Sequence, residues 1–331
     1  MVSVNEPASG LVVGVDSGGS GLRVALAEAA SGAVLETFSS REPVRTGPDG
    51  ISAGHLLEQV LPAVAALRER TGSRPVAAAA VGAAGMATLG DELRAELPRA
   101  FEEAWGVRRL ALAADAVTAY AGALGQRPGA VVAGGTGLIA LGTDLTAWRR
   151  ADGWGHLLGD CGSGAWIGRA GLEAAMRAHD GRRGGSAPLL SRAEKLFGPA
   201  AGLPGLLYPR TDRPAVLASF APEVGRCAAA DPVAAGILAR AGAHIAEAAE
   251  AVCPAEPGVP VALTGGLFRM GEPLLAPLRS ALGELLPGAR TAEAAGDPLA
   301  GAVALAAALA TGTLRLPEDP SLLRLFGAGA A

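Results

Sequence analysis

Residues 11–28 read LVVGVDSGGSGLRVALAE, and this stretch indicates the fold class. The apolar run Leu11–Asp16 ends in Gly and Asp, and a glycine-rich turn over residues 17–21 leads into a second apolar run, Leu22–Glu28. Ala33–Phe38 reads as a third strand after a further turn. Short apolar runs joined by glycine-rich turns predict an antiparallel meander.

Strands and helices alternate after this meander. Apolar residues recur at helical spacing over Ile51–Arg70, and Gly72 follows as a stop signal. A meander followed by strand–helix alternation predicts a mixed α/β sheet. The other elements expected in this half are strands over Pro75–Gly82 and Arg109–Ala114 and helices over Asp91–Trp105 and Asp115–Gly125.

The order of strand, glycine turn and strand begins again at residue 129. Gly129–Ala133 reads as a strand, Gly134–Gly137 as a turn, and Leu138–Gly142 and Leu145–Arg150 as further strands. The elements expected after them are helices within residues 164–219, a helix over Asp231–Val252, a strand over Val259–Thr264, and helices over Glu272–Leu285 and Asp297–Thr311.

This internal repeat predicts two domains of similar topology, which suits a length of 331 residues. We place the domains at residues 10–118 and 119–311. A closing helix near residues 312–326 is expected to pack back on the first domain. Because no low-complexity linker separates the halves, shared elements and a hinge should join them.

The composition limits the classes of function. Half of the residues are hydrophobic, and the net charge of −4 gives no electrostatic case for nucleic-acid binding. The longest charge-free apolar stretch, Pro298–Leu314, is shorter than the ~20 residues of a membrane-spanning helix. No signal-peptide pattern is evident, and the three cysteines are too far apart for a metal motif. We therefore expect a soluble, cytoplasmic protein that binds neither nucleic acid nor membrane.

Three glycine-rich turns follow apolar strands and are suited to phosphate binding. They are Gly14–Ser20, Val132–Gly137 and Leu263–Gly266. Glycines let backbone N–H groups approach a phosphate closely, and Asp16 in the first turn is placed to hold Mg²⁺ through water. A P-loop is excluded, because it requires Gly-Lys-Ser/Thr and Lys195 stands between Glu and Leu.

The three turns resemble the phosphate-1, phosphate-2 and adenosine motifs of the superfamily that contains actin, sugar kinases and the large heat-shock chaperones. The resemblance covers nearly the whole chain. It implies an α/β protein with two ribonuclease-H-like (actin-like ATPase) domains, a hinged cleft between them, and ATP and Mg²⁺ as cofactors. The residues expected to bind the nucleotide are Asp16, Gly18, Gly19, Ser20, Arg23, Gly135, Thr136, Gly137, Thr264, Gly265 and Gly266.

Asp115 is the candidate general base. Phosphoryl transfer to a hydroxyl needs in-line positioning, Mg²⁺ and a carboxylate that accepts the hydroxyl proton. Asp115 follows the apolar run Leu110–Ala114 and opens the next helix, so it should lie at the C-terminal end of a strand. A helix N-cap is the alternative role, and it is compatible with catalysis.

Residues 152–168 read DGWGHLLGDCGSGAWIG. This segment resembles the signature of the N-acetylglucosamine kinase branch, in the family of the ATPase activators of benzoyl-CoA reductase and hydroxyacyl-CoA dehydratases. The resemblance implies a kinase acting on O6 of a hexose or amino sugar, N-acetylglucosamine or glucosamine, with Asp115 as the base. It also implies that Trp154, Gly155 and Asp160 bind the sugar, and it suggests a homodimer. Ser163 is expected to cap the following helix rather than to contact a ligand.

Two positions depart from the pattern of these sugar kinases. The loop over residues 41–47 lacks the usual asparagine, and Leu138 and Ile139 stand where Ser-Asn is common. Each missing amide would have bonded the sugar, and an unmade bond costs on the order of 1–3 kcal/mol of discrimination. The charge of Glu42 in that loop instead motivates the hypothesis of a free amino sugar.

Two other functions stay open at this stage. An ATPase that activates a radical dehydratase would carry cluster cysteines near the nucleotide; Cys161 lies in that region, but its neighbours form no cluster set. A non-catalytic nucleotide or sugar sensor on the same fold would account for the missing amides. The presence of Asp16, Asp115 and Asp160 favours retained chemistry.

Overall fold

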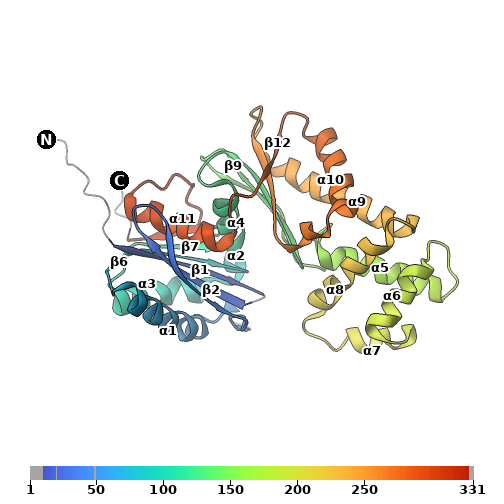
Figure 1. Cartoon of the computed structure of the whole chain (residues 1–331), viewed down its shortest axis with the longest axis horizontal. Coiled ribbons are helices and arrows are strands. Elements are labelled where there is room, and N and C mark those ends of the chain that lie inside the picture. The colour runs from blue at the N-terminus through green and yellow to red at the C-terminus, as the bar shows by residue number, and fades with distance from the viewer. Residues whose placement is uncertain (1–9, 20, 48–49, 328–331) are drawn as a thin grey trace. The chain divides into compact units, whose positions relative to one another are not determined.

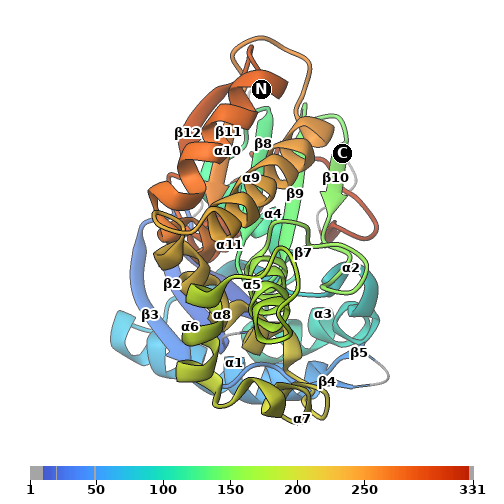
Figure 2. The same ribbon diagram turned by 90° about the vertical axis from the view of Figure 1, so that its right-hand side faces the viewer.

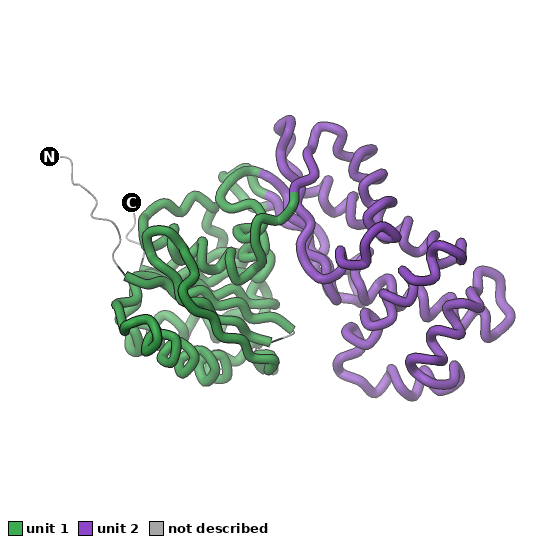
Figure 3. Tube along the Cα trace, in the orientation of Figure 1, with its two compact units in different colours: residues 1–128, 143–148, 293–331 green, residues 129–142, 149–292 purple. Residues whose placement is uncertain are grey.

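The computed structural model describes residues 10–19, 21–47 and 50–327 (Figure 1). The chain divides into two compact units (Figure 3). Unit 1 contains residues 1–128, 143–148 and 293–331, and unit 2 contains residues 129–142 and 149–292. Residues 119–128 and 293–311 therefore group with unit 1, whereas the sequence analysis placed them in the second domain.

Unit 1 contains a six-stranded sheet with the strand order β13-β7-β6-β1-β2-β3. The first three strands form the antiparallel meander that the sequence predicts, and β6 and β7 continue the sheet in parallel with β1. A separate two-stranded sheet pairs β4 (Thr46–Gly47) with β5 (Gly50–Ile51). The strands of the six-stranded sheet are β1 (Leu11–Gly18), β2 (Gly21–Glu28), β3 (Val34–Ser40), β6 (Val76–Ala83), β7 (Leu110–Ala114) and β13 (Leu323–Phe326).

Helices cover both faces of this sheet (Figure 1). On one face, α1 (Ala53–Thr71) packs on β2 and β3, with α3 (Asp91–Trp105) beside it. On the other face lie α4 (Asp115–Leu124) and α11 (Pro298–Thr311), and the short α2 (Met86–Leu89) follows β6.

The layer of α4 and α11 rests on close contacts at glycines. A Cβ atom at Gly301 of α11 would overlap the carbonyl oxygen of Thr118 in α4, and one at Gly122 of α4 would overlap the carbonyl oxygen of Asp297. Beneath them, a Cβ at Gly82 of β6 would lie 2.5 Å from the hydroxyl oxygen of Thr118. Only glycine lets the main chains approach so closely.

The C-terminal segment corrects one expectation. The prediction of a closing helix near residues 312–326 is wrong: α11 ends at Thr311, and its C-cap, Gly312, has a left-handed conformation (φ 68°). Residues 323–326 form β13, which pairs antiparallel with β7 at the sheet edge. Pro317 and Pro320 disfavour a helix between these points. The helix that returns to unit 1 is α11.

Unit 2 repeats the strand order of unit 1. Its sheet runs β10-β9-β8-β11-β12, with β8 and β11 parallel, as β3-β2-β1-β6-β7 does in unit 1 (Figure 2). Both units therefore have the ribonuclease-H-like topology of actin-like ATPase domains, which confirms the predicted α/β fold with two such domains. The strands are β8 (Gly129–Gly134), β9 (Leu138–Thr143), β10 (Trp148–Asp152), β11 (Pro260–Thr264) and β12 (Arg290–Glu293).

Six α-helices complete the described part of unit 2 around a core that includes Ile167, Phe220, Ile245 and Leu274. They are α5 (Gly164–His179), α6 (Ala187–Phe197), α7 (Leu203–Leu207), α8 (Arg213–Cys227), α9 (Pro232–Val252) and α10 (Glu272–Leu285), with short 3₁₀ helices at Ala200–Gly202 and Gly266–Met270. None of the helices in the described part of the chain is both long enough and apolar enough to cross a membrane.

The glycine contacts of unit 1 lead to a stability prediction. Gly301→Ala should lower the free energy of unfolding by about 2–3 kcal/mol, because its Cβ would push α11 away from α4. Gly54→Ala is the matched control, since Gly54 is exposed in α1 and a Cβ there would meet no described atom within 4 Å. Its free energy of unfolding should stay within about 1 kcal/mol of the wild-type value. Urea unfolding measures both, and equal values for the two variants would contradict the close contact.

Candidate functional site

An ion pair joins the two strands of the first hairpin. Asp16 on β1 and Arg23 on β2 are direct partners in the antiparallel register, so their side chains lie next to each other. Arg23 donates hydrogen bonds from Nε (3.0 Å) and Nη2 (2.6 Å), both to Oδ2 of Asp16. The side chain of Asp16 is only 14% exposed. A Cβ at Gly18 or Gly19, which follow Asp16 closely in the chain, would meet no described atom within 4 Å.

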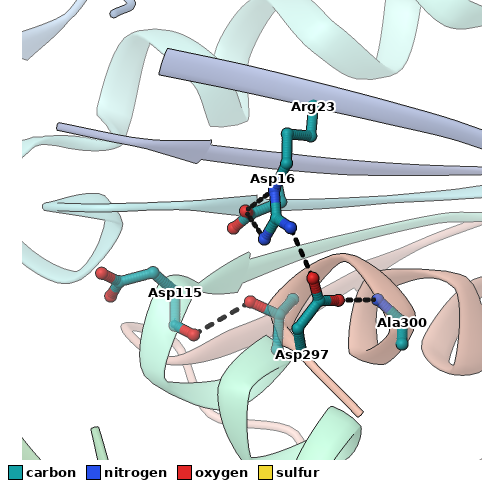
Figure 4. Close-up of polar contacts among 6 residues, drawn as sticks. Asp16, Arg23, Asp115, Asp297 and Ala300 are labelled. Carbon is teal, nitrogen blue, oxygen red and sulfur yellow. Dashed lines mark hydrogen bonds and ion pairs between the residues drawn. The ribbon is translucent and has the colours of Figure 1, made fainter. Parts of the chain in front are cut away.

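Asp297 extends this pair into a chain of three charged groups (Figure 4). It is the N-cap of α11, where its Oδ1 accepts a hydrogen bond from the N–H of Ala300 at 3.0 Å, and its Oδ2 accepts from Nη1 of Arg23. The Asp16–Arg23–Asp297 chain therefore links β1, β2 and the start of α11.

The two carboxyl groups of this chain are perturbed in opposite directions. Burial raises the pKa of Asp16 above its ordinary value; hydrogen bonding to Arg23 offsets part of this, and the negative charge of Asp297 adds to it. Burial acts on Asp297 in the same sense, but the Ala300 N–H and the Arg23 guanidinium outweigh it and hold the pKa of Asp297 below its ordinary value. Asp297 is thus the better stabilised carboxylate of the two.

Asp115 lies at the same edge of the sheet as Asp16. The parallel register aligns Ser17 on β1 with Ala83 on β6, and Ala83 with Ala114 on β7. Asp115 comes directly after β7, whose end lies two strand spacings, roughly 10 Å, from the end of β1. Open α/β sheets bind ligands outside this carboxyl edge.

Asp115 is the first residue of α4 and not its N-cap, which corrects the structural role that the sequence suggested. The N-cap is Ala114, with an extended backbone (φ −62°, ψ 147°). Oδ1 of Asp115 accepts from the N–H of Ala116 at 2.9 Å, and its carbonyl oxygen accepts from the hydroxyl of Thr118 at 2.9 Å. Figure 4 shows Asp115 apart from the Asp16–Arg23–Asp297 chain.

The loop after β3 is held at this edge by a buried histidine. Gly21 packs so closely on Ser40 that a Cβ would overlap the Ser40 carbonyl oxygen, so the loop starts beside the first glycine turn. Nδ1 of His55 accepts from the N–H of Arg45 at 3.1 Å, and its Nε2 lies 3.2 Å from Oε1 of Glu42. Because Nδ1 accepts, the ring proton is on Nε2, and this N–H group donates a hydrogen bond to Oε1 of Glu42. His55 thereby holds the Glu42 carboxylate in place.

Two glycine turns lie side by side at one edge of the unit 2 sheet. β8 ends at Gly134 and β11 at Thr264, and the parallel register places Thr264 opposite Ala133. Gly265 (φ 102°) packs on the main chain of Gly134, where a Cβ would overlap the carbonyl oxygen. Gly266 then begins a 3₁₀ helix, which precedes the predicted helix at residues 272–285.

Helix α5 fixes the turn over Gly135–Gly137. The N–H groups of Gly164 and Ala165 donate to two carbonyl oxygens of the turn at 2.9 and 3.0 Å. Ser163 is buried and caps α5, because its Oγ accepts from the N–H of Trp166 at 3.2 Å. The expected capping role of Ser163 is confirmed. The first donors of α5 thus hold the shape of the turn.

Two aspartates close the loop over residues 152–161. Asp152 accepts hydrogen bonds from the N–H groups of Asp160 (2.5 Å) and Cys161 (2.8 Å), and Oδ1 of Asp160 accepts from the N–H of Gly155 at 3.0 Å. Both aspartates have left-handed backbones (φ 60° and 53°), which Asp tolerates better than most residues. A Cβ at Gly137 would lie 2.5 Å from Oδ2 of Asp160, so this carboxylate rests against the neighbouring turn.

The three residues expected to bind sugar differ in exposure. Asp160 is 8% exposed, and burial raises its pKa, with a further contribution from the negative charge of Asp152. Trp154 is 62% exposed, and the Arg150 guanidinium lies 4.4 Å from its ring centroid. Gly155 is also exposed. Trp154 and Gly155 therefore lie at the surface of unit 2, with Asp160 beneath them.

The predicted residues form one group in each unit, and Ser20 lies outside the described residues. Sequence reasoning missed three residues that hold these groups or the neighbouring loop in place: Asp297, His55 and Asp152. The Asp-Pro pair at 297–298 signals a helix start, but nothing in the sequence marks an ion pair to a residue 274 positions away. The group in unit 1 is Asp16, Gly18, Gly19, Arg23 and Asp115, and that in unit 2 is Gly135, Thr136, Gly137, Trp154, Gly155, Asp160, Thr264, Gly265 and Gly266.

Similar proteins of known structure share this fold. The crystal structure of a candidate N-acetylglucosamine kinase from Chromobacterium violaceum is 28% identical with a TM-score of 0.62, over 90% of this chain and 99% of that one. That of a candidate N-acetylglucosamine kinase from Porphyromonas gingivalis is 17% identical with a TM-score of 0.64, over 88% of this chain and 96% of that one.

Sequence comparison gives a consistent result. The N-acetylmuramic acid/N-acetylglucosamine kinase of Clostridium acetobutylicum is 27% identical over 172 residues, which are 52% of this chain and 55% of that protein. The match thus spans about half the length of that curated relative. A family model matches residues 13–306, which is most of the chain. The chain belongs to the BadF/BadG/BcrA/BcrD ATPase family.

Proposed function

We propose that this protein is an ATP-dependent sugar kinase. It would transfer a phosphoryl group from ATP, with Mg²⁺, to O6 of a hexose or amino sugar, with glucosamine or N-acetylglucosamine as the substrate. The observation that carries the proposal is the presence of Asp16 and Asp115 at one edge of the unit 1 sheet. Phosphoryl transfer to a hydroxyl needs one carboxylate for the metal and one for the proton. The family, and the kinases among the relatives, support this reaction.

The donor set of unit 1 fits Mg²⁺ and a triphosphate. Mg²⁺ takes one or two carboxylates and completes its shell with water and phosphate oxygens. Asp16 offers such a carboxylate, since both contacts from Arg23 go to Oδ2. When bound, the metal would neutralise charge that develops on the phosphate oxygens. The other residues that we assign to the nucleotide are Gly18, Gly19 and Arg23 in unit 1 and Gly135, Thr136, Gly137, Thr264, Gly265 and Gly266 in unit 2.

Asp115 is assigned as the general base. Its Oδ1 accepts a hydrogen bond from the N–H of Ala116, which fixes the carboxylate at the start of α4, and a carboxylate is the group that accepts a hydroxyl proton in this reaction. It would take the hydroxyl proton as the new O–P bond forms and ADP leaves. Trp154, Gly155 and Asp160 of unit 2 are assigned to the sugar, because an aromatic ring packs on a sugar face and a carboxylate accepts from hydroxyls.

Replacing the base tests the proposed reaction. Asp115→Asn should lower sugar-stimulated ADP release by about 10²–10⁴-fold, because an amide does not accept the proton. Nucleotide binding, measured by calorimetry, should stay at the wild-type level. Asp91→Asn is the matched control, since Asp91 is likewise the first residue of a helix, α3, and its side chain is exposed. Wild-type turnover by Asp115→Asn would rule out the assignment.

Glu42 supports glucosamine as the preferred sugar. The carboxylate is fixed by His55 in a loop that starts beside the first glycine turn. A carboxylate accepts hydrogen bonds from an ammonium group, whereas it has no donor for the carbonyl oxygen of an acetamido group. An amide in place of the Glu42 carboxylate can donate to that carbonyl oxygen, so it would favour the acetylated sugar.

The substrate preference gives a second test. We expect a higher kcat/KM for glucosamine than for N-acetylglucosamine, and Glu42→Gln should lower the glucosamine value by about tenfold while sparing the acetylated sugar. Glu36→Gln is the control, because Glu36 lies on the largely exposed strand β3 and is paired with Arg70 of α1. A clear wild-type preference for N-acetylglucosamine would contradict the role of Glu42 and leave the kinase assignment intact.

A further inference from the structure

The contact between Arg23 and Asp16 is one-sided. A guanidinium and a carboxylate usually pair as two parallel forks, with one N–H group on each oxygen. Here Nε and Nη2 of Arg23 both donate to Oδ2 of Asp16, at 3.0 and 2.6 Å. The third nitrogen, Nη1, donates to Oδ2 of Asp297 (Figure 4). The guanidinium is therefore held between two carboxylates.

We propose that Asp297 is a positioning residue that keeps Asp16 available to Mg²⁺. This inference rests on the proposed role of Asp16 in binding Mg²⁺·ATP. While Nη1 is held by Asp297, Arg23 stays on one oxygen of Asp16. Without that hold, the guanidinium can turn into the two-forked pairing, which would engage both oxygens of Asp16.

The position of Asp297 suits this role, because both its main chain and its side chain are fixed. Its Oδ1 caps α11 through the N–H of Ala300 at 3.0 Å. Its carbonyl oxygen packs against Gly122 of α4, where a Cβ would overlap it. The carboxylate that holds Arg23 is therefore tied to two helices of unit 1.

Charge acts in the same direction as geometry. The Asp16–Arg23–Asp297 chain carries one net negative charge, which adds to the charge of Asp115 at this edge of the sheet and attracts a divalent cation. Removing the charge of Asp297 leaves a neutral pair. A neutral pair attracts Mg²⁺ less, so a variant without the Asp297 charge should need more Mg²⁺ to tighten nucleotide binding. A neutral pair also repels the triphosphate less, so binding of the nucleotide without Mg²⁺ should not become weaker.

The test measures nucleotide binding without sugar. The Kd of the non-hydrolysable ATP analogue AMPPNP is measured by calorimetry on the full chain, over a series of Mg²⁺ concentrations and in EDTA. Mg²⁺ lowers the Kd of AMPPNP, and in Asp297→Asn the Mg²⁺ concentration that gives half of this decrease should rise about three- to tenfold. The Kd in EDTA should stay equal or fall. Asp297→Ser should behave alike, because Asn and Ser both cap helices well.

Controls separate this role from general effects of charge and folding. Glu28→Gln removes a carboxylate from the Arg74 ion pair, at the far end of β2 from Arg23, and should keep the wild-type Mg²⁺ dependence. The proposal would be overturned if both Asp297 variants kept the wild-type Mg²⁺ dependence, or if Glu28→Gln shifted it as much as they do. It would also be overturned if the Asp297 variants bound AMPPNP as much more weakly in EDTA as they do with Mg²⁺. Mg²⁺-dependent AMPPNP binding by a wild type that phosphorylates no sugar would overturn the kinase assignment alone.

Discussion

The close approach of α4 and α11 is the constraint on which the rest of unit 1 depends. Gly122 and Gly301 let the two helices touch through their main chains, and Gly82 lets α4 settle on β6. Asp115 begins α4 and Asp297 precedes α11, so this packing sets where both carboxylates stand at the sheet edge. Acidic groups from distant parts of the chain are thus placed by backbone contacts, which vary less than the contacts of long side chains.

The two units fix their carboxylates by different means. In unit 2, Asp152 and Asp160 accept hydrogen bonds from backbone N–H groups of their own loop. Because the donors belong to the main chain, these bonds order no second side chain and cost no rotamer entropy of a partner. In unit 1, Asp16 is held by Arg23, whose guanidinium also bonds Asp297. A side-chain ion pair can change partner when a cation or a phosphate arrives, whereas the loop in unit 2 keeps its shape through its own backbone.

Much of the fold could be predicted because its signals are local. The helices at 91–105 and 272–285 match α3 and α10 at both ends, since glycines and acidic residues mark where they begin. The short strands β12 and β13 were missed, because four residues carry too little pattern and their neighbours set their pairing. Asp16 and Asp115 could be found because each follows an apolar run. Asp297 and His55 could not, because their partners come from tertiary packing. The homodimer stays a prediction.

Phosphorus NMR of the reaction mixture tests the central claim most directly. The wild-type protein is incubated with ATP, Mg²⁺ and glucosamine or N-acetylglucosamine, and the phosphorus signals are followed over time. A sugar kinase gives ADP together with a new phosphomonoester whose signal couples to the protons on C6. ADP with inorganic phosphate and no phosphomonoester would indicate an ATPase, and it would contradict the assignment of Asp115 as the base that activates a sugar hydroxyl.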